Sequence, residues 1–172
     1  MHRKMGFFLF SLLTLSLGVT LASWPVNVVS MNVDGEGTFF SSPVPEGWGF
    51  RSRIIHSLEK TPVEDDYRVV CGRIWQWEER YRSNNAGLPT EVPRNGRFLS
   101  CPGWFVIRGG RNAWDLLFYR VGNSDLGKNI LSADGFGLFR LYELVPGKKL
   151  SLRVISIPLA LSSRVLRQQD LR

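Results

Sequence analysis

The chain has 172 residues, 22 Lys and Arg, 15 Asp and Glu, and a formal net charge of +7. This is the length of one ordinary domain, and the 44% hydrophobic and 22% charged content excludes wholesale disorder, collagen and coiled coils. The 17 Gly and 9 Pro follow no period and alternate with many aromatic residues. We therefore expect an all-β or β-rich fold with long loops.

The first two dozen residues have the layout of a secretory signal peptide. Arg3 and Lys4 precede an uncharged, Leu- and Phe-rich run at 6–19, and small residues follow at Ala22 and Ser23. The run is too short for a permanent membrane span. We predict cleavage after Ala22 or Ser23, with an uncleaved buried or amphipathic segment as the alternative. Loss of Arg3 and Lys4 lowers the charge from +7 to +5, and the mature protein is expected to be secreted, extracellular and without a membrane span.

The remaining chain reads as short extended segments separated by turns. We predict a signal peptide at 1–22, a β-rich domain at 23–161 and a basic tail at 162–172. Strands are expected at 26–33, 38–41, 50–57, 67–74, 97–100, 104–108 and 113–121, with a helical turn as the alternative at 113–121, and a strand or a helical turn is expected at 75–81. Loops are expected at 58–66, 83–96 and 122–137. The segments 138–144 and 150–158 are expected to form a hairpin around Pro146 and Gly147.

Two segments of the domain resemble each other. Residues 40–43 (FSSP) match residues 99–102 (LSCP), and each copy continues into a Gly-Trp pair, at 47–48 and at 103–104. A period of 56 to 59 residues fits a duplicated β-loop-β unit. The alternative is a chance similarity between turn-rich segments.

This unit resembles the repeat of the dermatopontin family, which has a Cys-Pro segment and an Asp-Arg-x-Trp box that leads to a second Cys. The segment 24–27 (WPVN) resembles the entry to the first repeat, 64–71 (EDDYRVVC) its box, and 101–102 the opening of the second repeat. In the box, the order Asp66-Tyr67-Arg68 departs from the family pattern. The resemblance implies extracellular-matrix adhesion, collagen-fibril organisation and proteoglycan contact, and some relatives act as lectins or agglutinins.

The resemblance also gives the two cysteines a meaning. Family repeats close with a disulfide between the Cys of Cys-Pro and the Cys after the box. Here Ser42 stands in place of the opening Cys of the first repeat, and Val121 or a neighbour stands in place of the closing Cys of the second repeat. Each cysteine is then the survivor of a different pair. In an oxidising compartment, Cys71 and Cys101 either form one disulfide that bridges the repeats or remain thiols that can link chains.

The sequence offers little for catalysis or metal binding. After cleavage His56 is the one histidine, which argues against a Ser-His-Asp site, and we expect no enzyme and no cofactor. The acidic run Glu64-Asp65-Asp66 is read as a solvated loop rather than a Ca²⁺ site. Carboxylates for a carbohydrate-active enzyme exist, but no spacing selects a pair among them. They are Glu78, Glu79, Asp115 and Asp134.

Arginine and tryptophan form the candidate binding surface. Guanidinium groups suit sulfate and carboxylate, and aromatic faces stack on sugars; the alternative is a tryptophan core covered by arginine stems. We predict binding of a proteoglycan, a sulfated glycan or collagen and no nucleic acid, with a lectin-type defence protein or a small carbohydrate-active enzyme as alternatives. The oligomeric state stays open. The residues proposed for binding are Trp48, Arg51, Arg53, Arg97, Trp104, Arg108, Arg111 and Trp114.

Overall fold

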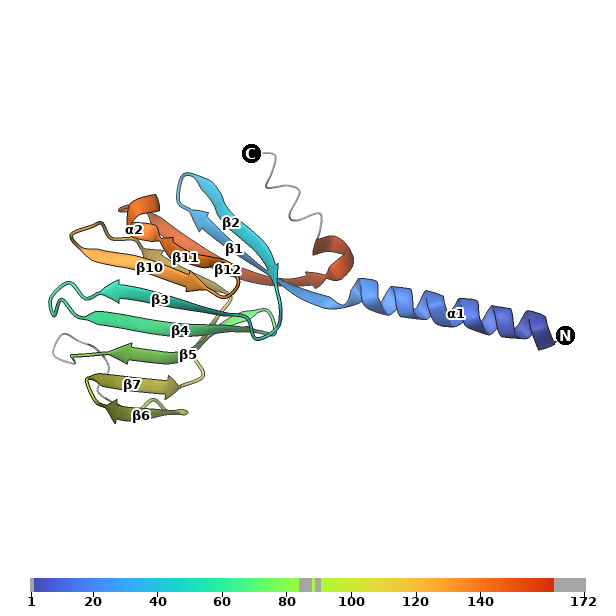
Figure 1. Ribbon diagram of the computed structural model, residues 1–172, viewed down its shortest axis with the longest axis horizontal. Coiled ribbons are helices and arrows are strands. Elements are labelled where there is room, and N and C mark those ends of the chain that lie inside the picture. Colours follow the sequence, from blue (N-terminus) through green and yellow to red (C-terminus); the bar gives the residue numbers. More distant parts are fainter. Residues whose placement is uncertain (1, 84–87, 89–90, 163–172) are drawn as a thin grey trace.

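The computed structural model, which describes residues 2–83, 88 and 91–162, consists of one N-terminal helix and two antiparallel β-sheets (Figure 1). The first sheet has four strands in the order β2 (Gly37–Val44), β1 (Pro25–Val33), β12 (Lys149–Pro158) and β9 (Leu116–Arg120). The predicted β-rich fold class is thereby confirmed.

The second sheet has eight strands. Seven follow the order β11 (Gly137–Arg140), β10 (Gly127–Ala133), β3 (Gly49–Ile55), β4 (Pro62–Val70), β5 (Arg73–Tyr81), β7 (Trp104–Gly109) and β6 (Gly96–Cys101). The eighth, β8 (Ala113–Trp114), pairs with the first residues of β5. A single helical turn, α2 (Leu141–Leu144), connects β11 towards β12.

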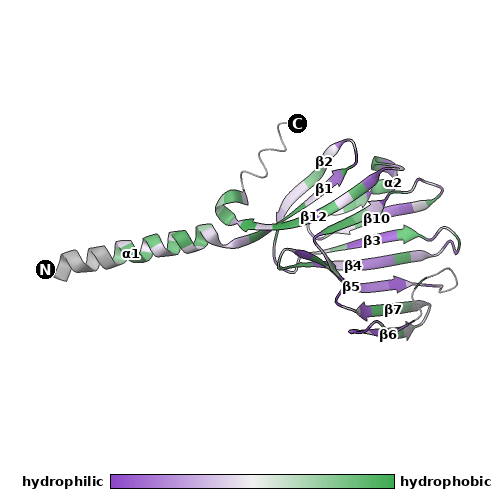
Figure 2. Cartoon of the chain, turned by 180° about the vertical axis from the view of Figure 1, so that it is seen from behind, coloured by the Kyte–Doolittle hydropathy of each residue, from purple (hydrophilic) through white to green (hydrophobic). Residues whose placement is uncertain are grey.

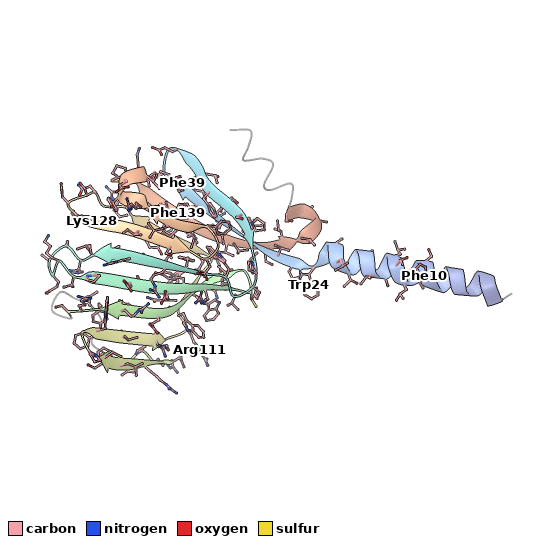
Figure 3. All side chains as sticks on the ribbon, in the orientation of Figure 1. Phe10, Trp24, Phe39, Arg111, Lys128 and Phe139 are labelled. Carbon is pink, nitrogen blue, oxygen red and sulfur yellow. The ribbon has the colours of Figure 1, made fainter. Side chains whose placement is uncertain are left out.

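Helix α1 (His2–Ser23) projects away from both sheets (Figure 1). From Phe10 onward its apolar side chains contact solvent, with Phe10 65% and Leu13 66% exposed. Figure 2 shows the apolar character of this part of the helix, and Figure 3 shows Phe10 far from the sheets. Among the residues that the structure describes, no helix is long and apolar enough to cross a membrane. Cleavage of the segment stays a prediction.

The main core lies between the two sheets, because alternate residues of each strand point to the same side. In the four-stranded sheet, β1 contributes Val29, Met31 and Val33, and β12 contributes Leu150, Leu152 and Val154 opposite them. The eight-stranded sheet contributes a more aromatic surface. Its core residues are Phe50, Tyr67, Val69, Ile74, Leu131 and Ala133.

A smaller cluster extends the inner side of the eight-stranded sheet towards β7 and β6. Val63, Tyr81 and Ile107 are buried there, and Phe98 and Phe105 pack against them. Phe105 lies directly opposite Tyr81, with ring centroids 5.7 Å apart. Because the strands of this end are paired over only six residues, aromatic cross-strand contacts supply much of its packing.

Three predicted elements are wrong in instructive ways. Residues 62–66 were expected in a loop but form half of β4, because Glu64 and Asp66 form ion pairs with arginines of the neighbouring strands. Residues 127–133 were also expected in a loop but form β10, which pairs with both β3 and β11. The hairpin around Pro146 is absent, since β12 pairs with β1 and β9 instead. Residues 163–172 of the basic tail lie outside the described residues.

The two copies of the predicted repeat do not occupy equivalent places. Residues 40–43 lie in β2 at an edge of the four-stranded sheet, whereas residues 99–101 lie in β6 at an edge of the eight-stranded sheet. The strands that follow also differ, because the first copy continues into β3 and β4 of the eight-stranded sheet, whereas the second reaches β9 of the four-stranded sheet. The sequence similarity therefore reflects shared turn chemistry and not a duplicated unit.

Candidate functional site

The side of the eight-stranded sheet that points away from the four-stranded sheet, here called the outer face, carries most of the charge. One row of directly opposed residues crosses seven strands from β11 to β6. Strand alternation places every second residue on this face, so the pattern arises from charged residues two positions apart in β3, β4 and β5. The row contains Leu138, Ser132, Arg51, Asp66, Glu78, Arg108 and Arg97.

Ion pairs join the charged residues of the outer face across β3, β4, β5 and β7. Arg51 makes a two-pronged contact with Asp66, from Nε to Oδ1 at 2.6 Å and from Nη2 to Oδ2 at 3.0 Å. Arg80 lies 2.9 Å from Asp66 and 3.2 Å from Glu78, and Arg108 Nε donates to Glu78 at 2.7 Å. We call this network the ladder. Its members are Arg51, Arg53, Glu64, Asp66, Glu78, Arg80 and Arg108.

The ladder is layered, with its anions beneath its cations. The side chains of its three carboxylates are between 11% and 19% exposed, whereas those of Arg51, Arg53 and Arg108 are between 44% and 54% exposed. The hydrogen bond from Arg51 to Asp66 raises the pKa of the arginine above its ordinary value. Four arginines against three acids leave one net positive charge, and the guanidinium groups form its solvent-facing layer.

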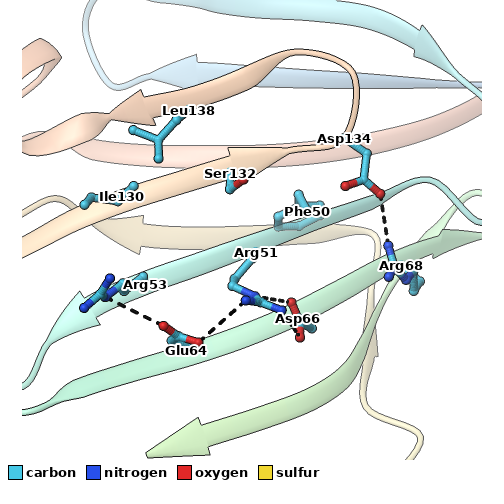
Figure 4. Close-up of a pocket in the computed structure, with 10 residues that line it drawn as sticks. All are labelled: Phe50, Arg51, Arg53, Glu64, Asp66, Arg68, Ile130, Ser132, Asp134 and Leu138. Carbon is cyan, nitrogen blue, oxygen red and sulfur yellow. Dashed lines mark hydrogen bonds and ion pairs between the residues drawn. The ribbon is translucent and has the colours of Figure 1, made fainter.

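A first groove lies on the outer face between β10 and β4 (Figure 4). It has a volume of about 310 Å³ and combines ladder arginines with an apolar wall of Ile130 and Leu138. At its end, Arg68 Nη1 donates to Asp134 Oδ2 at 3.2 Å. Each arginine of this groove forms an ion pair with a carboxylate, so the groove carries little net charge.

A second groove, here called the β6 groove, has a volume of about 290 Å³ and holds the aromatic part of the face. Trp77 sits at a β-bulge, since Gln76 pairs with Tyr67 while Glu78 pairs with Asp66. A bulge re-aims a side chain, and Trp77 is 57% exposed as a result. Trp77, Arg97, Leu99 and Arg108 line this groove.

The β6 groove carries excess positive charge. Arg97 and Arg108 are directly opposite each other on neighbouring strands, and like charges in such positions repel. Glu78 neutralises Arg108. Arg97 is exposed and takes part in no ion pair among the described residues. A cation next to an exposed indole is a suitable contact for an anion that also has an apolar face.

The structure brings together four of the arginines proposed for binding. Arg51, Arg53, Arg97 and Arg108 share the outer face. Arg111 does not join them, because it lies in the connection from β7 to β8 with a positive φ of 57° (Figure 3). The segment that forms β3 was predicted as a strand, but Glu64 and Asp66, two of the three acids of the ladder, were expected in a loop.

The three tryptophans proposed for binding are placed differently from the prediction. Trp48 is 6% exposed in the main core, and its Nε1 donates to the carbonyl oxygen of Asp134 at 2.7 Å. Trp114 packs against the same core. Trp104 is partly covered by the guanidinium of Arg82, 4.8 Å from its ring centroid. The exposed aromatic of the outer face is Trp77, which the binding prediction omitted.

The predicted disulfide is not formed in the structure, where Cys71 and Cys101 are exposed free thiols. Cys71 lies in the turn between β4 and β5, next to Arg73, whereas Cys101 lies opposite Trp104 near the other end of β5. The length of β5 separates them, which is about 25 Å for a nine-residue strand. A disulfide needs Cα atoms within about 7 Å, so these two residues cannot pair within one chain.

We expect both thiols to react with Ellman's reagent in the native, unreduced protein, because both are exposed. The expected result is two titrated thiols for each chain, with no increase after denaturation. The variants Cys71→Ser and Cys101→Ser are each expected to give one. A native titration of zero that rises on reduction would contradict the structural assignment.

The acidic run at 64–66 does not form a cation site of its own. Strand alternation places Glu64 and Asp66 on the outer face and Asp65 on the inner face, so the three carboxylates cannot converge. In the described part of the chain, no group of three or more His, Cys, Asp or Glu is positioned to hold a metal ion. His56 lies after β3, where its Nδ1 accepts a long hydrogen bond of 3.4 Å from the Glu59 amide.

The sequence analysis did not predict a pair of acids that lies on the inner side of the eight-stranded sheet. Asp65 and Glu79 are directly opposite each other on β4 and β5, and Gln76 Nε2 donates to Asp65 Oδ1 at 2.9 Å. Burial raises the pKa of Asp65 to about 6. Burial, and then the charge of Asp65, raises the pKa of Glu79 to about 7. Nothing in the local sequence distinguishes these acids from their neighbours, because only the fold decides which face is buried.

Comparison with known proteins gives one result. A family model described as a domain of unknown function, DUF1850, matches residues 50–136, which is half of the chain. No curated protein and no solved structure matches the chain. The matched segment runs from β3 to β10 and contains the ladder and the β6 groove.

This result corrects the resemblance to the dermatopontin family, for which the comparisons give no support. The repeat that carried the resemblance is absent from the structure, and of the two alternatives for Cys71 and Cys101 the structure has the free thiols. Matrix adhesion and collagen-fibril organisation, which the resemblance alone implied, are therefore set aside. The chain belongs to the family of the domain of unknown function DUF1850.

Proposed function

We propose that this chain is an exported, non-catalytic binding domain that holds a sulfated or carboxylated glycan on the outer face of its eight-stranded sheet. The observation that carries the proposal is the β6 groove, where exposed Trp77 lies beside Arg97 and Arg108. An indole face packs against a sugar ring, while guanidinium groups bind its anionic substituents.

The layering of the ladder supports an extended ligand. Its exposed layer consists of guanidinium groups, and its carboxylates lie beneath them. The row from Arg97 to Arg51 crosses five strands, which spans about 19 Å at the usual spacing between strands. A chain of several sugar residues is long enough to contact Trp77 and to continue along the arginines.

The inner acids do not favour a glycoside hydrolase. Buried carboxylates with raised pKa values are common in active sites. However, the hollow beside Glu79 measures about 90 Å³, well below the roughly 300–1,000 Å³ of known ligand pockets. A sugar ring does not fit there, and we assign Asp65 and Glu79 a structural role.

The decisive experiment measures binding of a heparin oligosaccharide to the full chain by calorimetry. We expect Arg97→Gln to weaken binding about fivefold to tenfold, because one charge-assisted contact is lost. Arg153→Gln serves as the matched control, since Arg153 is also an exposed strand arginine but lies in the four-stranded sheet. Trp77→Ala is expected to weaken binding by a similar factor.

The pattern of results separates a specific site from general attraction. Equal losses for Arg97→Gln and Arg153→Gln would show that binding follows net charge alone and would contradict the proposal. Equal affinity for an uncharged dextran oligosaccharide would contradict the anionic requirement. A large effect of Trp77→Ala together with no effect of Arg97→Gln would favour the lectin-type alternative over the anionic glycan.

A further inference from the structure

A fourth hollow, here called the end pocket, shares no lining residue with the two grooves of the outer face. It is the largest of the pockets described above, at about 510 Å³, and this volume falls within the range of known small-molecule sites. Its walls come from the end of β3, the end of β9 and the start of β10. Residues from both sheets therefore form it.

The lining of the end pocket is mainly apolar. Ile54 and Ile55 line it from the end of β3, Val121 lines it from the main core, and Leu126 lines it from the turn before β10. Leu126 is 51% exposed although it is a large apolar residue. An acyl or aromatic group in the pocket would remove this side chain and the isoleucines from water.

Hydrogen bonds hold the rim of the end pocket in place without a ligand. Asn123 Oδ1 accepts from the amides of Asp125 and Leu126, at 2.9 and 2.7 Å. Buried Asn129 accepts from the Gly122 amide at 2.6 Å. A side chain at Gly122 would collide with the Leu126 carbonyl oxygen at 1.9 Å, so this turn requires glycine. The pocket is thus built by the fold, which lowers the entropic cost of binding.

The charge at the rim of the end pocket is positive. Arg120 lines the rim, is exposed, and makes no ion pair within the described residues. It lies directly opposite Lys149, whose Nζ sits 4.5 Å from the centroid of the Phe118 ring. Within the described residues neither side chain makes an ion pair, so this pair of neighbouring cations attracts an anion. Of the two, Arg120 lines the end pocket. Asp125, in the turn that ends at Leu126, is the acid of this rim, and its Oδ1 accepts a weak hydrogen bond from Ser124.

We propose that the end pocket binds a small amphiphilic carboxylate, with its apolar part against Ile54, Ile55 and Leu126 and its carboxylate on Arg120. The site is independent of the glycan surface, because the end pocket and the β6 groove share no lining residue. Charge complementarity at the rim and the apolar interior together select this class of ligand over neutral or cationic amphiphiles.

The test measures binding of decanoate, decanol and decyltrimethylammonium to the full chain. Changes in the amide chemical shifts in solution report both the affinity and the site of each probe. Decanoate is expected to bind more tightly than either analogue and to shift the amides of Gly122, Gly127 and Gly147, which line the pocket. Gly18 reports separately on helix α1, whose exposed apolar side chains are the competing site.

Two variants and one control separate the contribution of the charged contact from that of the apolar contact. Arg120→Gln is expected to weaken decanoate about tenfold and to leave decanol unchanged, since only the charged contact is lost. Leu126→Ser should weaken both ligands, and Arg153→Gln neither. Shifts confined to Gly18, or equal affinities for decanoate and decyltrimethylammonium, would overturn the proposal.

Discussion

Replacing Trp48 by alanine is expected to lower the free energy of unfolding by about 4 kcal/mol, a large part of the stability of a typical domain. Trp48 is buried between the sheets, with ring centroids 5.6 Å from Phe50 and 6.1 Å from Phe136. Its Nε1 also anchors the β10–β11 turn through the Asp134 carbonyl oxygen. The variant therefore loses packing on both sides and one hydrogen bond.

The matched control is Trp77→Ala, the same chemical change at an exposed position. It should alter the free energy of unfolding by less than about 0.5 kcal/mol. Urea unfolding followed by circular dichroism measures both variants. A loss for Trp48→Ala no greater than that for Trp77→Ala would contradict the placement of Trp48 in the core. Trp48→Phe, which retains a ring but not the donor, is expected to fall between the two.

Replacing Asp65 by asparagine is expected to stabilise the protein by about 2 kcal/mol at pH 8. Asparagine has the shape of aspartate, and its carboxamide oxygen still accepts from Gln76. It carries no charge, so the cost of burying an ionised carboxylate disappears. The size of the effect follows from the pKa of Asp65, which burial raises from 3.8 to about 6.

The pH dependence of this gain has a definite sign. A raised pKa means that the folded chain binds more protons than the unfolded chain between about pH 4 and pH 6 for Asp65, and up to about pH 7 for Glu79. The wild-type stability from these groups is present below pH 4 and is lost as the pH rises through that window. The advantage of Asp65→Asn should therefore shrink as the pH falls from 8 towards 4.

Urea unfolding of wild type and Asp65→Asn at pH 4.5, 6 and 8 measures the effect. Asp125→Asn is the control, because Asp125 is an exposed residue on a turn. A destabilisation by Asp65→Asn at pH 8 would show that the ionised carboxylate is favourably solvated within the fold. That result would contradict the burial of Asp65 on the inner face.

The sequence analysis succeeded where local signals decide the structure. The Val-rich segment 26–33 and the apolar run at 104–107 predicted strands, which the structure contains as β1 and β7. The strand β10 was missed because Leu131 is its only large apolar inward residue, and Lys128 and Asn129 suggest a loop. Its pairing with β3 and β11 stabilises the strand, and no window of sequence contains that information.

The candidate site was predictable only in part for the same reason. Arginine and tryptophan were recognised as binding residues by their chemistry, but chemistry does not reveal burial. Trp48 and Trp77 are the same residue type, yet one fills the core and the other stands on a bulge. Asp66 was expected in a loop because its arginine partners, Arg51 and Arg80, lie 15 and 14 residues away along the chain.

The pairing of β1 with β12 constrains the order in which the strands of this fold can pair during folding. The two strands are in register over nine residue pairs, from Pro25 with Pro158 to Val33 with Leu150, although more than a hundred residues separate them along the chain. Contacts of such long range close slowly, because the loop entropy is lost before the contacts form. The strands of the eight-stranded sheet between Gly49 and Arg140 are contiguous apart from β9 and can pair earlier. Until β12 has been synthesised, β1 lacks its partner on one side and β9 has no neighbouring strand. The core face of the eight-stranded sheet therefore remains exposed to solvent until the last strand pairs.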